Sequence, residues 1–163
     1  MKNKGEILAA IMNKFDNCYF FLHNTKEKHI AEKILHEGFI FENQLPHSTD
    51  RVNPGEPIEV TYFLFQRKDY GNFTIIIAVS RKIYERYTNL SNIFDLGIED
   101  IMTISKPVYG DNDELMFTIS PGHILGYFNN KTSEFFMNRL WDENHDCTIN
   151  KTFRRRPAGQ QEN

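Results

Sequence analysis

Three residue types that can do chemistry lie at the ends of apolar runs in this sequence, or within them. His23 ends one run, Tyr62 lies within a second, and Glu114 opens a third. A carboxylate stabilises positive charge that develops during a reaction, and an aromatic face binds a flat cationic ring. These residues form the candidate site, provided that the elements carrying them converge.

The region around His23 predicts a strand, a helix and a second strand in close succession. Cys18–Leu22 is a compact aromatic and aliphatic run typical of a strand, and Thr25 is placed to cap the helix that follows. One apolar stripe runs along that helix, formed by Ile30, Ile34 and Leu35. Gly38 ends the helix in a left-handed conformation, before the short apolar run 39–41.

Helical and alternating patterns predict the remaining elements. The expected helices cover residues 4–14, 81–87 after a Ser80 cap, and 132–141. The expected strands cover residues 58–65, 73–79, 101–108 with an interruption at Pro107, and 114–119. Residues 42–57 are rich in Pro, Asn and Gly and predict a loop that covers a site, and residues 110–113 predict a turn.

Composition predicts one folded domain with a polar tail. The chain has 163 residues, 40% of them hydrophobic, and a formal net charge of −3. We assign residues 1–150 to a single domain and residues 151–163, with Arg154–Arg156, to a disordered tail. A mixed charge distribution excludes long-range capture of nucleic acid by a basic field.

The two cysteines, Cys18 and Cys147, are predicted to be reduced thiols, because no metal-ligand spacing joins them to other residues. We therefore expect no metal. No signal peptide or membrane-spanning run is seen, which predicts a cytoplasmic protein with no membrane partner. The histidines outside the candidate site are expected at the surface: His29, His36, His47, His123 and His145.

The order of these motifs resembles the His–Tyr–Glu branch of the ADP-ribosyltransferases, shared by diphtheria toxin and the poly(ADP-ribose) polymerases. Residues 19–128 carry the resemblance: His23-Asn24-Thr25 before a helix, Thr61-Tyr62-Phe63 with Tyr70 downstream, and Glu114 opening a strand. The family usually has Gly where this chain has Asn24, and Gly where it has Thr61.

The resemblance implies an α+β fold, with two split antiparallel β-sheets and flanking helices at the N-terminus, after Thr25 and at the C-terminus. It implies NAD as substrate and transfer of one ADP-ribose to a macromolecular acceptor, protein or nucleic acid, with release of nicotinamide. Glu114 would bond the ribose 2′-hydroxyl, and His23 would hold the other ribose. Tyr62 and Tyr70 would sandwich the nicotinamide ring, whose amide the backbone at Asn24 would read.

Other interpretations remain open. Asn112, two positions before Glu114, matches neither family form of the residue that selects an acceptor. Thr25 either supports the first motif or only caps its helix, and Arg51 and Arg67 either meet phosphates or stay in solvent. The alternatives to a transferase are a degenerate module that binds a nucleotide or a protein, and an RNA 2′-phosphotransferase-like enzyme. Each candidate site residue also has a purely structural interpretation. Glu114 is then part of an acidic turn, Tyr62 packs in the core, and His23 is an edge residue at the end of a strand.

Overall fold

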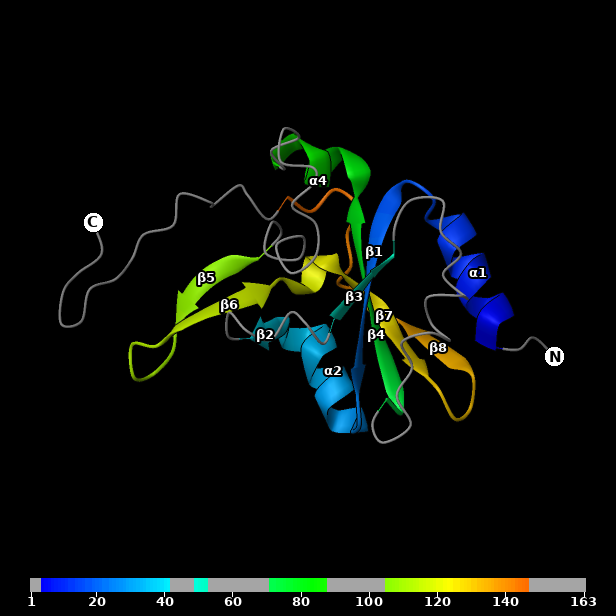
Figure 1. Cartoon of the computed structure of the whole chain (residues 1–163), viewed down its shortest axis with the longest axis horizontal. Coiled ribbons are helices and arrows are strands. Elements are labelled where there is room, and N and C mark those ends of the chain that lie inside the picture. Colours follow the sequence, from blue (N-terminus) through cyan, green and yellow to red (C-terminus); the bar gives the residue numbers. More distant parts are fainter. Residues whose placement is uncertain (1–3, 42–48, 53–70, 88–104, 147–163) are drawn as a thin grey trace.

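A computed structural model gives the fold, and it describes residues 4–41, 49–52, 71–87 and 105–146 (Figure 1). The predictions for Tyr62, Tyr70, Thr61, Arg67 and His47 lie outside these residues, as do the strand expected over 58–65 and the tail 151–163. No helix within the described ranges is long and apolar enough to cross a bilayer.

A five-stranded antiparallel sheet is built around two long strands, β1 (Cys18–Thr25) and β4 (Phe73–Ser80). Its strand order is β3-β1-β4-β7-β8, with β3 at Thr49–Val52, β7 at Ile124–Asn129 and β8 at Glu134–Met137. Every residue of β4 is buried, as expected for a β-branched run covered on both faces.

The second sheet has three antiparallel strands in the order β2-β6-β5. The strands are β2 (Phe39–Phe41), β6 (Leu115–Ile119) and β5 (Lys106–Tyr109). Pro107 lies within β5, and an edge strand tolerates it because one side of the strand needs no ladder bond. Residues 101–104 of the strand expected over 101–108 lie outside the described residues. The β5–β6 hairpin extends away from the larger sheet, toward the left of Figure 1.

Helices α1 (Lys4–Lys14) and α2 (Lys28–Glu37) cover opposite faces of the five-stranded sheet (Figure 1). Side chains alternate along a strand, so β1 supplies both cores. Phe20 and Leu22 pack with Leu8 of α1, whereas Phe21 packs with Ala31 of α2. The predicted helices 4–14 and 81–87 are confirmed, the second as α4 (Arg81–Tyr87).

The prediction that Thr25 caps α2 is wrong. Thr25 is the last residue of β1 and pairs with Phe73, and Glu27 occupies the cap position without a side-chain cap bond. Gly38 does end the helix, at φ 93° and ψ 171°, a positive-φ conformation that is not left-handed helical and that glycine adopts without strain. A Cβ at Gly38 would lie 2.5 Å from the carbonyl oxygen of Ile119, so only glycine lets β2 approach β6 here.

The helix predicted over 132–141 is also wrong, because the chain forms a hairpin and adds β8 to the sheet. The Asn129 side chain accepts hydrogen bonds from the backbone of Lys131 and Thr132, and Ser133 takes a positive φ of 64°. Phe135 then packs with the α1 core, whereas Phe136 stacks on Tyr127 from the opposite face. Pairing with β7 thus puts Phe135 and Phe136 on opposite faces of the sheet.

Four residues of the loop predicted over 42–57 instead form β3, where Arg51 pairs with Phe21 of β1. The predicted turn at 110–113 and the strand that follows it are confirmed. The chain is therefore an α+β fold of helices and two antiparallel sheets, but without the expected C-terminal helix.

Candidate functional site

His23 lies where the two sheets meet. Its backbone pairs with Ile75 of β4 and Thr49 of β3, and its half-buried ring lies 4.5 Å from the ring of Phe39, centroid to centroid. Phe39 belongs to β2 of the smaller sheet and pairs with Ile119. The turn, helix and glycine between His23 and Phe39 therefore carry the chain from one sheet to the other.

A row of residues continues from His23 across the larger sheet. His23 pairs with Ile75, Ile75 with Tyr127, and Tyr127 with Phe136, so all four side chains lie on the face covered by α2. The Tyr127 ring stacks on Phe136 with centroids 4.9 Å apart. Its hydroxyl lies 3.4 Å from Glu32 of α2, to which it donates a hydrogen bond.

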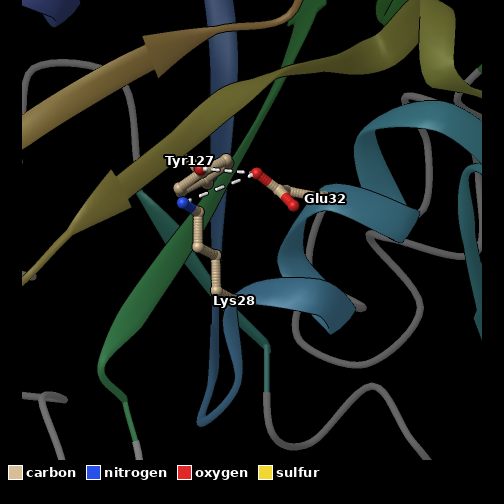
Figure 2. Close-up of polar contacts among 3 residues, drawn as sticks. All are labelled: Lys28, Glu32 and Tyr127. Carbon is tan, nitrogen blue, oxygen red and sulfur yellow. Dashed lines mark hydrogen bonds and ion pairs between the residues drawn. The ribbon is translucent and has the colours of Figure 1, made fainter.

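Figure 2 shows the polar group that Tyr127 of this row forms with two residues of α2. Lys28 lies 4.0 Å from the Glu32 carboxylate, one helical turn away, and both side chains are more than half exposed. An exposed pair of this kind adds little to stability. Burial and the nearby Glu32 carboxylate raise the pKa of Tyr127, so its hydroxyl stays protonated and donating. Neither Glu32 nor Tyr127 stood out in the sequence, because only the fold brings β7 beneath α2.

Asn24 turns its side chain to the opposite face of β1 from His23. The Thr74 hydroxyl donates a hydrogen bond of 2.6 Å to the amide oxygen of Asn24. The side chain at this position therefore does not lie on the His23 face, and only the Asn24 backbone adjoins that face. Thr25, half-buried, is positioned by its pairing with Phe73.

Glu114 is exposed and lies in the β5–β6 turn. Its carboxylate accepts a 2.9 Å hydrogen bond from the backbone N–H of Asn112, and its carbonyl accepts one from Gly110. Ile119, the residue opposite Phe39, is five positions further along, which at the rise of a β-strand is about 16 Å. The structure places His23 at the sheet junction and Glu114 in the hairpin turn, and it does not bring these two side chains together.

Two histidines expected at the surface, His123 and His145, pack against each other, and the prediction is wrong because His123 is buried and His145 half-buried. His123 is 1% exposed in the turn between β6 and β7, and the His145 ring lies 4.6 Å away. Burial, and then the proximity of His145, lowers the pKa of His123 to about 3, and burial also lowers the pKa of His145. Their Nε2 atoms are buried without a hydrogen-bond partner among the described residues.

Within the described part of the chain, no group of three or more histidine, cysteine or acidic side chains is arranged to hold a metal ion. Cys18 is a buried free thiol whose pKa burial raises to about 12, which leaves it protonated and unsuited to act as a ligand or nucleophile.

Comparison with known proteins found no matching family model, no matching curated protein and no matching solved structure. The case for a function therefore depends on the residues and geometry described above.

Proposed function

We propose that this chain transfers ADP-ribose from NAD to a macromolecular acceptor and releases nicotinamide. The observation that carries the proposal is the connection through His23: β1 in one antiparallel sheet, helix α2, Gly38 at positive φ, and β2 in the other sheet. The half-buried His23 ring lies at that connection against Phe39. In this proposal the ligand binds at this junction, against the motif that ends β1.

In this proposal the glycosidic bond between nicotinamide and ribose breaks, and nicotinamide leaves with the bonding electron pair. An acceptor nucleophile then attacks the anomeric carbon and gives up its proton. His23 holds one ribose, the Asn24 backbone reads the nicotinamide amide, and Tyr62 and Tyr70 stack on its ring. Glu114 stabilises the positive charge that develops on the sugar, which is where a carboxylate accelerates this reaction most.

The transferase role requires Glu114 to leave its turn and approach the ribose. Its solvent-exposed hydrogen bond from Asn112 contributes about 1 kcal/mol or less to keeping the carboxylate in the turn. The larger requirement is that the β5–β6 hairpin, whose turn is closed by the bond from Gly110 to Glu114, approaches His23. The β5–β6 turn also contains Gly110 and an Asp113 at positive φ of 60°.

The position of Glu114 favours a second candidate function. In this second candidate, the Glu114 carboxylate stays bonded to its own turn. The fold then binds a nucleotide at His23 and does not cleave it. This module would recognise NAD or a related nucleotide through the same junction and would lack transferase activity.

One experiment distinguishes the two candidates. Purified protein is incubated with NAD, free nicotinamide is measured, and thermal unfolding is followed with and without NAD. The transferase proposal predicts release that falls about 100-fold in Glu114→Gln. Release should persist in Asp111→Asn, a matched loss of charge in the same exposed turn. His23→Ala should abolish both release and stabilisation.

Stabilisation by NAD without nicotinamide release would support the binding module. A protein that neither releases nicotinamide nor gains stability from NAD would refute both candidates. Release that is equal in Glu114→Gln and in the unchanged protein would exclude Glu114 as the stabilising carboxylate.

A further inference from the structure

A chain of buried polar side chains lies behind the end of β1, on the face opposite His23. Thr74 of β4 is 1% exposed, and Asn130, which follows β7, is 5% exposed. The β4 residues beyond Thr74 are apolar as far as Val79. Buried hydroxyl and amide groups of this kind are costly unless each finds a partner, so their bonds indicate what they hold in place.

The Thr74 hydroxyl lies 2.6 Å from the amide oxygen of Asn24 and 3.2 Å from that of Asn130, and the shorter contact decides where it donates. A threonine hydroxyl has a single hydrogen, which it donates to the amide oxygen of Asn24 at 2.6 Å. The same hydroxyl then accepts from the Asn130 amide nitrogen at 3.0 Å. The Asn130 amide also donates to the carbonyl oxygen of Gly71. Thr74 thus links the end of β1 to the residue after β7.

Asn72 provides a second connection, from Asn130 to Lys26, the residue after β1. The backbone N–H of Asn130 donates to the carbonyl of Asn72 at 2.8 Å, and the Asn72 side chain donates to the carbonyl of Lys26 at 3.0 Å. The segment 24–26 is therefore held on both sides of Thr25, by the side chain of Asn24 and by the backbone of Lys26. Both connections lead to Asn130.

We infer that Thr74 and Asn130 are positioning residues that fix the backbone of residues 24–26 for ligand binding on the His23 face. The inference rests on the proposed function, because it assigns these residues to the same site. It also explains Asn24: its amide takes part in the buried network and lies away from the ligand face, so it need not be a glycine. Neither Thr74 nor Asn130 contacts the ligand itself.

The test compares Thr74→Val with Thr74→Ser. Valine keeps the shape but removes the hydroxyl, which leaves the amides of Asn24 and Asn130 without their shared partner, whereas serine keeps the hydroxyl. Thr118→Val is the matched control, because Thr118 is a half-buried threonine in β6, outside this network. Backbone amide NMR signals of residues 23–26, NAD affinity and melting temperature are measured for each variant.

We expect Thr74→Val to shift the NMR signals of residues 23–26 and to weaken NAD binding about tenfold or more, even well below its melting temperature. Thr74→Ser should keep both the signals and the affinity, and Thr118→Val should change neither. Asn24→Ala, which breaks the network from its half-buried end, should produce the same signal shifts. It serves as the second variant if Thr74→Val fails to fold.

Unchanged signals at residues 23–26 in Thr74→Val would overturn the inference, and so would an unchanged signal of Lys26 in Asn24→Ala, since Lys26 is not adjacent to the substituted residue. A lower melting temperature with unaltered NAD affinity would also overturn it, since that is the result of a purely structural role. If the unchanged protein binds no NAD, the proposed function fails. The NMR signals then still decide whether Thr74 and Asn130 position this segment.

Discussion

The buried His123, packed against the half-buried His145, predicts that mild acid destabilises this protein. His123 is 1% exposed and packs against His145, and Lys106 and the carboxylate of Asp146 also act on it. Burial and His145 lower its pKa from the ordinary value of 6.5 to about 3, so the folded protein keeps this imidazole neutral. The unfolded chain has no such restriction and binds a proton at its ordinary pKa.

The size of the effect follows from this difference in pKa. Below about pH 6.5 the unfolded state binds more protons than the folded state, so the free energy of unfolding falls as the pH falls. From about pH 7.5 to about pH 5, the His123 contribution to that free energy drops by about 2 kcal/mol. The loss continues toward pH 3, where the folded imidazole itself becomes protonated.

The measurement is urea unfolding at about pH 7.5 and about pH 5 for the unchanged protein and for His123→Gln. Glutamine stays neutral at both values, so the variant should lose about 2 kcal/mol less than the unchanged protein on acidification, whatever its stability at neutral pH. His36→Gln is the control for removing an imidazole from the surface, because His36 is exposed on α2. His123→Leu replaces the variant if glutamine prevents folding.

An acid-induced loss of stability that is equal in His123→Gln and in the unchanged protein would refute the reasoning. It would mean that the His123 ring is accessible to protons in the folded state, and that carboxylates alone cause the pH dependence. A partial change in His145→Gln is also expected, since His145 contributes to the low pKa of His123 and has a lowered pKa of its own.

Three further predictions follow from the packing. Asn138→Ala should lower the free energy of unfolding by about 2–3 kcal/mol in urea, because the buried amide donates to the carbonyls of Leu35, Pro121 and Ile124; an unchanged midpoint would contradict this. Gly126→Ala should cost about 1–3 kcal/mol, because its Cβ would meet the β8 backbone; an unaltered melting temperature would argue against that contact. In a Cys147→Ser background, Cys18 should react with thiol reagents only as fast as the protein unfolds, because burial raises its pKa to about 12; rapid labelling of the folded protein would show that the thiol is accessible.

Local patterns predicted the elements whose cause is local. The helix over residues 4–14, the helix end at Gly38 and the turn at 110–113 depend on side-chain spacing and backbone preferences of neighbouring residues. The β-branched run 73–79 predicted a central strand correctly, because a run without polar alternation must be covered on both faces.

Contacts between distant segments overturned the other predictions. Residues 134–137 became a strand because β7 offered an unpaired edge, and residues 49–52 joined β1 for the same reason. His123 was expected at the surface, yet the segment carrying His145 returns across the turn before β7 and covers it. None of these pairings has a signal within a short window of sequence.

The features of the candidate site also fall into those that local sequence predicts and those that tertiary contacts decide. The sequence by itself determined that His23 lies near the end of a strand and precedes a helix closed by Gly38, because strand propensity and a positive φ are properties of the residues concerned. Only the tertiary structure decided that His23 meets Phe39 of the other sheet, that Asn24 bonds Thr74, and that Glu114 lies in the β5–β6 turn. Those outcomes depend on which strands pair and in which register, and pairing is a property of the whole chain.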